Sequence, residues 1–350
     1  MSSRIEIAGR TVGPGQPAFV IAEVGQSHDG SLGMAHAFID TAAACGADAI
    51  KFQTHIAAAE STLDEEFRVK FSRQDETRFD YWRRMEFSPE QWAGLAAHAA
   101  EKGIVFLSSA FSVAAVELLR ELGLAAWKVG SGEYRSDDLW QAMAAGGAPI
   151  LLSTGMSEWR EIEAAVERVR ELGAPLALFQ CTSRYPTALE HVGLNIIDDL
   201  RRFGCPVGLS DHSGSVHPSL AALARGADMI EVHLTLDRRL FGPDVPVSLT
   251  PPELTLLCEA RDALVTMAQN PVDKDAMAAD LREMRGLFSK SLAPTRTLSA
   301  GTQLTADMLT AKKPGTGIPT AELDDVVGRR LVADVGPERL LRREDLDDQP

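Results

Sequence analysis

The chain has 350 residues, of which 45% are apolar and 24% are charged, and its formal net charge is −15 at pH 7. This is the composition of an ordinary globular protein that is long enough for one large domain and a smaller one. The negative charge argues against a general surface for nucleic acid or for an anionic membrane. Positive groups that bind an anionic substrate must therefore lie inside a pocket.

The N-terminal segment and the cysteines predict a cytoplasmic protein. Residues 1–13 contain no apolar run of the signal-peptide type, and no apolar stretch of the sequence is long enough to span a bilayer. The four cysteines, Cys45, Cys181, Cys205 and Cys258, are scattered and show no CxxC spacing. This pattern predicts free thiols in a reducing compartment and argues against a zinc site.

Eight short apolar runs predict strands, and each is followed by a longer segment with helical periodicity. The runs are residues 18–25, 48–53, 104–110, 125–131, 149–154, 176–181, 206–211 and 228–234. The segments between them place apolar residues three and four apart and end in glycine, as helices do, and 251–269 supplies a last helix. Strands that alternate with helices pair in parallel, and eight such units favour a closed (β/α)₈ TIM barrel.

A doubly wound open sheet is the alternative fold. That fold usually opens with a GxGxxG loop after the first strand, and the sequence here is GQSHDG. Beyond residue 270 the pattern breaks: residues 271–290 are interpreted as a linker, and residues 291–350 have short β-prone runs with many turn signals. The predicted domains are therefore a barrel over 1–270 and a small β-rich domain over 291–350.

Polar residues gather where the predicted strands end, which is where TIM barrels place their chemistry. In chain order they are Glu23, Lys51, Gln53, Ser109, Lys128, Ser131, Glu133, Ser153, Ser183, Tyr185, Asp211, His212, Glu231 and His233. A single buried lysine or histidine is more often structural than catalytic. Burying so many charges without function would cost several kcal/mol for each unpaired ion, which favours an active site.

The residue types narrow the chemistry. Lysine supplies a point charge and serine supplies hydrogen-bond donors, so Lys51 and Lys128 with neighbouring serines can bind a small phosphorylated anion. A Schiff base on Lys128 is the competing interpretation. His212 and His233, on neighbouring strands, can share one divalent ion, with Glu133 as a third ligand directly or through water. Two hydrogen-bonded core histidines are an equally open alternative.

Longer stretches of sequence carry a family resemblance. They are IAEVGQSHDGSLGMAHAFIDTAAACGADAIKFQT, FLSSAFS, WKVGSGE, LLSTGMS, QCTSRYPT, GLSDHSG, EVHLTLDR and GPD. Their order and spacing resemble the sialic acid (N-acetylneuraminate) synthase family, which includes the E-type spore-coat polysaccharide synthesis proteins. The tail, with KKPGTGI, resembles the small antifreeze-like (SAF) domain of these enzymes. The resemblance covers nearly the whole chain and implies a TIM barrel followed by a SAF domain.

The family implies a condensation of phosphoenolpyruvate with an open-chain amino sugar, such as N-acetylmannosamine, to a nine-carbon 2-keto acid and phosphate. Carried over by position, the residues that would hold phosphoenolpyruvate are Lys51, Ser109, Lys128, Ser131 and Ser153, with Ser183 also in the substrate site. Glu133, Gln53, Tyr185 and Asp244 would face the sugar, and Glu23 would lie near the reacting carbons. His212 and His233 would bind a metal, Mn²⁺ first and Mg²⁺ or Co²⁺ as alternatives. The resemblance displaces the Schiff base.

The resemblance also implies a domain-swapped homodimer, in which each SAF domain covers the partner's barrel and Lys313 reaches the sugar. Several sugar-side positions depart from the family pattern. They are Ser27 and Asp29 in place of Asn, Val232 in place of Lys, Val245-Pro246 in place of His-Lys, and Lys313 in place of Arg. The sequence therefore predicts the type of reaction but does not determine which sugar is the substrate. A related synthase with another aldehyde sugar and a non-catalytic sugar-binding barrel are the alternatives.

Overall fold

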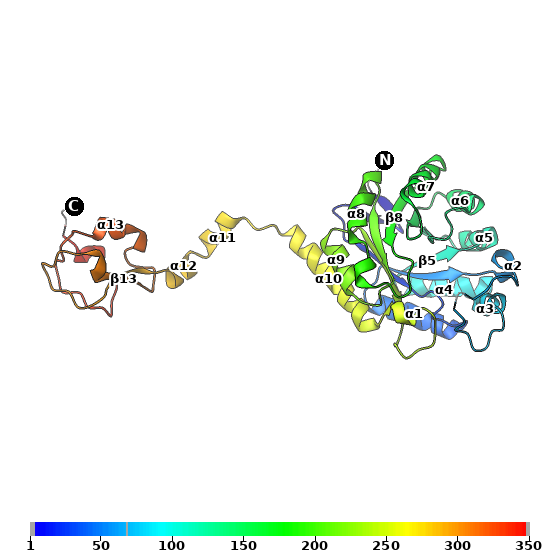
Figure 1. Ribbon diagram of the computed structural model, residues 1–350, viewed down its shortest axis with the longest axis horizontal. Helices are drawn as coiled ribbons and strands as arrows, with labels where there is room; N and C mark the ends of the chain where they lie inside the picture. Colours follow the sequence, from blue (N-terminus) through cyan, green and yellow to red (C-terminus); the bar gives the residue numbers. More distant parts are fainter. Residues whose placement is uncertain (1–3, 68, 348–350) are drawn as a thin grey trace. The chain divides into compact units, whose positions relative to one another are not determined.

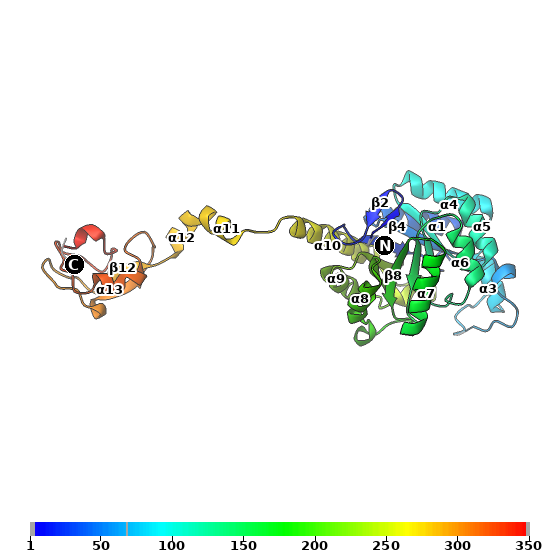
Figure 2. The same ribbon diagram turned by 90° about the horizontal axis from the view of Figure 1, so that it is seen from above.

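The computed structural model describes residues 4–67 and 69–347, and the chain divides into two compact units, Met1–Gln269 and Asn270–Pro350. In the first unit the strands lie inside and the helices lie outside them (Figure 1 and, from above, Figure 2). Within the described residues, no helix has both the length and the apolar character that a membrane crossing needs.

Eight parallel strands close into a barrel, as the alternation of strand and helix signals predicted. The strands are β3 (Phe19–Glu23), β4 (Ala49–Thr54), β5 (Val105–Ala110), β6 (Trp127–Val129), β7 (Ile150–Ser153), β8 (Leu176–Cys181), β9 (Val207–Asp211) and β10 (Met229–Leu234). They pair in chain order, and β10 pairs with both β9 and β3, which closes the ring. The TIM barrel is thus confirmed and the open sheet is excluded. A short strand, β11 (Ser248–Leu249), pairs beside the end of β10.

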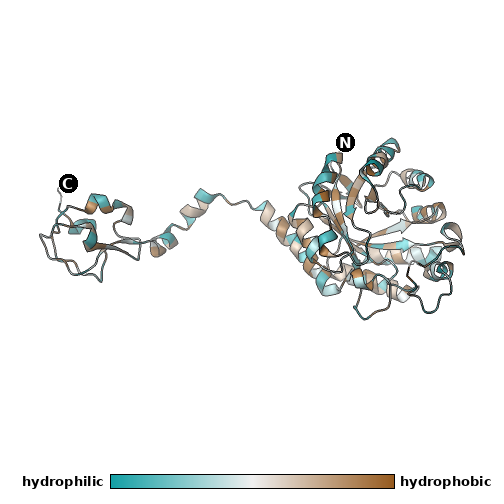
Figure 3. Cartoon of the chain, in the orientation of Figure 1, coloured by the Kyte–Doolittle hydropathy of each residue, from teal (hydrophilic) through white to brown (hydrophobic). Residues whose placement is uncertain are grey.

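The helices of the first unit bury one face against the strands. They are α1 (Leu32–Ala44), α2 (Ala57–Glu60), α3 (Arg78–Met85), α4 (Pro89–Glu101), α5 (Val113–Glu121), α6 (Asp137–Ala144), α7 (Trp159–Glu171), α8 (Leu194–Leu200), α9 (His217–Ala224) and α10 (Pro251–Gln269). Helix α7 shows the cause: Ile162, Val166 and Val169 are buried at spacings of three and four, and Gly173, at φ 74°, follows its end. The two faces of such helices are visible as brown and teal in Figure 3.

An N-terminal hairpin that the sequence did not predict contributes to the barrel's apolar interior. Strands β1 (Ile5–Ile7) and β2 (Arg10–Val12) pair antiparallel, and Ile5, Ile7 and Val12 join one buried cluster with inward residues of the barrel strands. We call this cluster the apolar floor; its strand members include Phe19 and Ile21. Because side chains alternate along a strand, Glu23 faces the interior in the next layer above Ile21. The alternation therefore places a charged layer on top of the apolar floor.

The second unit contains helices, a small sheet and its own core. Helices α11 (Lys274–Asp280) and α12 (Arg282–Phe288) occupy most of the segment that was expected to be a linker. Strands β12 (Ser291–Pro294) and β13 (Leu309–Lys312) pair antiparallel, and α13 (Leu323–Val326) follows. A separate apolar cluster, which includes Leu292, Ile318 and Leu341, forms the core. The C-terminal region therefore has an apolar core of its own.

Candidate active site

Four charged side chains from four parts of the barrel form one buried network. Lys51 Nζ on β4 lies 2.7 Å from Glu23 Oε2 on β3 and 3.7 Å from Glu231 Oε2 on β10. Lys128 Nζ on β6 lies 3.3 Å from Glu231 Oε1. The four side chains are 2–7% exposed. Two ammonium groups and two carboxylates balance, so each charge is paired despite its burial.

The protonation states in this network follow from burial and from the opposite charges. Burial alone would lower the pKa of Lys51, but the carboxylates of Glu23 and Glu231 outweigh it and raise the pKa above its usual value. Burial alone would raise the pKa of Glu231; Lys128, Lys51 and a hydrogen bond from Ser210 (2.9 Å) together lower it. Lys51 and Glu231 are therefore both ionised at neutral pH.

Serine hydroxyls surround the two lysines, as the sequence predicted for an anion site. Lys51 Nζ donates to Ser109 Oγ at 3.3 Å, and Lys128 Nζ donates to Ser153 Oγ at 2.6 Å. Strand register explains the first of these contacts, because Gln53, two residues after Lys51, pairs with Ser109. Each lysine thus has a hydroxyl beside it.

A second group of hydroxyls lies at the ends of β6, β7 and β8. Ser131 Oγ accepts from the backbone N–H of Gly155 at 3.1 Å and from Ser183 Oγ at 3.5 Å, and it lies 3.3 Å from Cys181 Sγ. A Cβ on Gly155 would lie 2.5 Å from Cys181 Sγ and 2.6 Å from Ser183 Oγ. Glycine is therefore required for the backbone to approach these side chains.

The two predicted metal-ligating histidines lie side by side. The ring centroids of His212 and His233 are 5.4 Å apart. His212 Nδ1 lies 3.1 Å from the Thr182 carbonyl oxygen, so this nitrogen is the donor, and Nε2 accepts from the Tyr185 hydroxyl at 2.9 Å. Burial is the main cause that lowers the pKa of His212 to about 3. Its imidazole is therefore neutral at pH 7, which is the form that binds metals.

His233 has an unused buried nitrogen. Its Nδ1 atom has no hydrogen-bond partner among the described residues and lies 3.9 Å from Asp244 Oδ2. Because buried polar atoms are nearly always paired, this nitrogen fits a missing ligand. In the part of the chain that the structure describes, no set of three His, Cys, Asp or Glu side chains is arranged to hold a metal. The two imidazoles fit a divalent ion as two of its ligands, and its other ligands would be water or substrate oxygens.

No described contact joins Glu133 to the histidines, for which it is a predicted third ligand directly or through water. Its carboxylate accepts from Ser136 Oγ at 2.8 Å near the start of α6, and its side chain is half-buried. Lys313 lies in the second unit, where its ammonium group sits 5.0 Å from the centre of the Phe288 ring. The contact of Glu133 is thus local to the start of α6, and that of Lys313 lies within the second unit.

The remaining sugar-side residues border the charged network. Gln53 Nε2 donates to Glu23 Oε1 at 2.8 Å, and Asp244 Oδ2 accepts from the backbone N–H of Gln26 at 3.2 Å. Strand register places His233 opposite Glu23, so the histidines and the network adjoin. Tyr185 is 40% exposed and is therefore the part of this group most accessible to solvent.

Glu231 was predicted to lie at a strand end but was not among the predicted site residues. In the structure its carboxylate contacts both lysines. The signal was the alternation in MIEVHL, because Glu231 and His233 are two apart and share the inward face. Gln26 and His55 were missed as well. His55 continues the alternation of Lys51 and Gln53 beyond the strand, whereas Gln26 stands in a loop without a pattern that could have revealed it.

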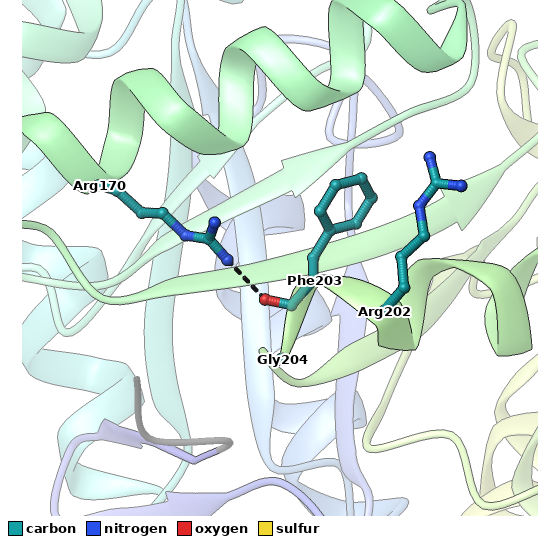
Figure 4. A pocket seen from close by; sticks show the side chains of 4 residues that line it. All are labelled: Arg170, Arg202, Phe203 and Gly204. Carbon is teal, nitrogen blue, oxygen red and sulfur yellow. Dashed lines mark hydrogen bonds between the residues drawn. The ribbon is translucent and has the colours of Figure 1, made fainter.

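A cavity of about 370 Å³ lies elsewhere, on the outside of the barrel (Figure 4). It is lined by Arg170, Arg202, Phe203 and Gly204, and the Arg170 guanidinium donates to the Phe203 carbonyl oxygen at 2.6 Å. These residues lie at the end of α7 and before the start of β9, which is the end of the barrel opposite to the charged network. The sequence-predicted site residues do not line this cavity.

Comparisons with known proteins agree with the geometry. The model of the NeuB family matches residues 38–272, and the model of the SAF domain matches residues 289–347. The chain belongs to the NeuB family. The predicted resemblance and the C-terminal SAF domain are thereby confirmed.

Among characterised NeuB-type relatives, the N-acetylneuraminate-9-phosphate synthase of Homo sapiens is 34% identical over 97% of this chain and 95% of its own length. The N,N'-diacetyllegionaminic acid synthase of Campylobacter jejuni is 33% identical over 92% of this chain and 98% of its own length. A solved sialic acid synthetase from Leptospira borgpetersenii superposes with a TM-score of 0.70 at 30% identity, over 81% of this chain and 97% of that one. These NeuB relatives make different sugars, so membership does not fix the product.

Proposed function

We propose that the protein condenses phosphoenolpyruvate with the aldehyde group of an open-chain amino sugar. The products would be a sialic-acid-like nine-carbon 2-keto acid, used for surface polysaccharide, and phosphate. The observation that carries the proposal is the buried ion-pair network of Lys51, Glu23, Glu231 and Lys128 beside two imidazoles at the carboxyl ends of the strands. Relatives that are named as synthases of N-acetylneuraminate 9-phosphate, legionaminic acid and pseudaminic acid support the reaction type.

The anion would bind to the two ammonium groups. Lys51 and Lys128 each already donate to a serine hydroxyl, and these donors can turn to phosphate and carboxylate oxygens. The hydroxyls of Ser131 and Ser183 and the N–H of Gly155 supply further donors nearby. The pairing of Lys128 with Glu231 favours a role as a cation over a Schiff-base nucleophile.

The chemistry balances without a redox step. The C2–C3 π electrons of phosphoenolpyruvate form the new bond from C3 to the aldehyde carbon, and the aldehyde oxygen takes a proton to become a hydroxyl. Water adds to the cationic C2 and loses its protons, and the bond from C2 to the bridging oxygen breaks, so that phosphate leaves with that oxygen. Glu23, fixed by Lys51 and Gln53, is our candidate for holding and moving the proton of this water.

The sugar would bind on the side of Gln53, Tyr185, Asp244 and Glu133. His212 and His233 would hold a divalent ion, Mn²⁺ in the first place and Mg²⁺ or Co²⁺ as alternatives. The chemistry such an ion supplies when bound is Lewis-acid polarisation of the aldehyde oxygen. Tyr185 would have to release His212 Nε2 to make that nitrogen available, and its hydroxyl could then donate to the sugar.

We further propose a cytoplasmic homodimer in which each SAF domain covers the partner's barrel. Leu281 and Leu287 in the α11–α12 segment are 45% and 64% exposed, which supports a partner surface there. Lys313, next to the exposed Phe288 ring, would reach the sugar bound in the other subunit. A lysine there lacks the planar fork of arginine, so a sugar with a different acyl group fits this position.

The experiment is a phosphate-release assay with purified full-length protein, phosphoenolpyruvate, Mn²⁺ and a panel of aldehyde amino sugars. We expect phosphate release that requires one class of sugar and that produces a 2-keto acid in equal amount. Lys128→Met is the matched control, because it removes one cation from the anion site. Binding of a sugar without phosphate release from any panel member would favour the non-catalytic sugar-binding barrel. Turnover with a non-amino aldehyde sugar alone would favour the related aldol synthase.

A further inference from the structure

Next to the charged network, His55 occupies a tightly enclosed place. It follows the end of β4 and is 3% exposed. Its imidazole is stacked between Trp82 at 4.0 Å, with 19° between the planes, and Phe111 at 4.6 Å, with 2°. Its Nδ1 atom lies 2.5 Å from Glu60 Oε1. Stacking therefore fixes the plane of the imidazole ring. Which ring nitrogen carries a proton depends on the hydrogen bonds that the ring makes.

Hydrogen bonds around His55 assign its protons. Gln26 Nε2 lies 2.7 Å from Gln53 Oε1 and 3.0 Å from His55 Nε2, and the two hydrogens of this amide group can serve both. His55 Nε2 also lies 3.4 Å from Gln53 Oε1, to which it could only donate. The shorter contact decides, because the Gln26 amide nitrogen can only donate and at 3.0 Å needs an acceptor in His55 Nε2. Nδ1 then carries the proton and donates it to Glu60. The carboxylate of Glu60 thus selects the tautomer of His55.

We propose that the Glu60–His55 pair is a positioning device that fixes the amide orientations of Gln26 and Gln53 and, through them, the Glu23 carboxylate. The chain of hydrogen bonds runs from Glu60 to His55, Gln26 and Gln53, and ends where Gln53 Nε2 donates to Glu23 Oε1 at 2.8 Å. Glu60 and His55 are positioning residues, because their effect on the reaction passes through the two glutamines. The kinetic part of this inference rests on the proposed function.

The reason for such a device lies in the symmetry of the amide group. The two ends of a glutamine amide have nearly the same shape, so packing alone does not choose between them. If Gln53 turned over, its oxygen would face Glu23 Oε1, and two acceptors would meet in a buried place. A donor on Gln26, held in place by an unprotonated His55 Nε2, prevents this reversal. Gln53 then offers a fixed donor to the carboxylate that is to handle the proton.

The first test is made on the wild-type protein and needs no turnover. In the wild-type protein labelled with ¹⁵N-histidine, long-range ¹H–¹⁵N spectra distinguish a protonated ring nitrogen from an unprotonated one. The His55 signals are assigned by their loss in His55→Gln. We expect His55 to be neutral with the proton on Nδ1. A proton on Nε2, in the neutral or the charged ring, would overturn the proposal.

The second test is kinetic and uses Glu60→Leu, which removes the acceptor of the Nδ1 proton. We expect KM for the sugar to rise about tenfold and kcat to fall about tenfold, because the two glutamines lose their fixed orientation. The dissociation constant of phosphoenolpyruvate alone, measured by calorimetry, should stay within about twofold, since the lysine contacts are untouched. Glu60→Gln keeps a carbonyl acceptor and should restore most of the loss.

Glu65→Leu is the matched control. Glu65 accepts a hydrogen bond from Nε1 of Trp82, the ring that stacks on His55, at 3.0 Å, and it forms an ion pair with Arg78. Glu65 has no described contact with His55 itself. We expect this variant to keep the wild-type KM. Equal effects of both leucine variants, or an unchanged KM in a folded Glu60→Leu protein, would refute the proposed positioning device. If the wild type turns over no sugar at all, the proposed function fails, and the nitrogen spectra still decide the proton assignment.

Discussion

The Glu231 carboxylate lies 3.3 Å from the Lys128 ammonium group, and its other oxygen faces Lys51 at 3.7 Å, so one buried anion is shared by two cations. Glu231→Gln would leave two ammonium groups with one carboxylate. We expect a loss of about 3 kcal/mol in the free energy of unfolding, because an uncompensated charge would remain buried. Urea unfolding at pH 7 measures this loss.

The control for this prediction is Glu253→Gln, which removes a half-exposed ion pair to Arg238 at 2.7 Å. Such a pair contributes about 1 kcal/mol or less. Similar losses for the two variants would contradict the view that Glu231 is the shared counterion.

A second prediction concerns acid stability and His28. Burial is the main cause that lowers the pKa of His28 from 6.5 to about 3. Because the folded pKa is the lower one, the unfolded chain takes up a proton below about pH 6.5 that the folded chain refuses until about pH 3. Stability due to this group is complete above pH 6.5 and is lost as the pH falls toward 3.

His28→Gln keeps an acceptor for the Gly30 N–H, which bonds to His28 Nδ1 at 3.1 Å, but it removes the titration. Between pH 7 and pH 5 the wild type should lose about 2 kcal/mol more unfolding free energy than the variant. Urea midpoints at the two pH values give this difference. An identical pH dependence in both proteins would show that folding does not lower the pKa of His28.

The third prediction concerns the divalent ion. Treatment with a strong chelator should abolish turnover, and Mn²⁺ should restore it, because the unpaired His233 nitrogen and neutral His212 suit a metal. Binding of Mn²⁺ by the dialysed protein, followed by electron paramagnetic resonance, should weaken at least tenfold in His233→Ala. Full activity in the presence of the chelator would contradict the metal's role.

The fourth prediction follows the bridging oxygen of phosphoenolpyruvate. With ¹⁸O in that position, the label should appear in the released phosphate, because capture of C2 by water breaks the bond between C2 and oxygen. Mass spectrometry of both products gives the answer. Label in the keto acid would mean cleavage of the bond between phosphorus and oxygen, and the proposed chemistry would be wrong.

The fifth prediction concerns closure of the barrel by the partner's SAF domain. Lys128→Ala and Lys313→Ala should each be weak as homodimers. In a mixed dimer one site would receive both defects and the other site neither, so activity should recover on mixing. A confirmed heterodimer that stays as weak as its parents would show that the SAF domain does not act on the partner's site.

Much of the first unit could be predicted because each strand carries a local signal. The eight apolar runs and the polar residues at their ends are visible in the sequence, and the barrel places those ends together. For this reason the sequence alone could indicate Lys51, Ser109, Lys128 and Ser153, and the structure brings them into contact in two pairs. The hairpin β1–β2 was missed because its strands have three residues each, too few for a periodic pattern.

The partners within the site could not be predicted from strand ends alone. Which carboxylate faces which lysine depends on the strand register and on side chains that cross the barrel, as Glu231 does between β4 and β6. Glu133 shows the same limit, since its position in the sequence allowed a metal ligand, directly or through water, but gave no sign that its carboxylate would bond to Ser136. The hydrogen bonds that Gln26 makes to His55 and Gln53 depend on the conformation of a loop, which the composition and residue spacing of the sequence do not indicate.

The apolar floor has a kinetic consequence for the proposed reaction. With Ile7, Phe19 and Ile21 buried on one side of the charged network, molecules would enter and leave past Tyr185, on the solvent side of the site. The phosphoenolpyruvate bound to Lys51 and Lys128 would then lie deeper than the sugar, and a bound sugar would block its exit. Phosphoenolpyruvate would load before the sugar, and phosphate would escape only after the keto acid had gone.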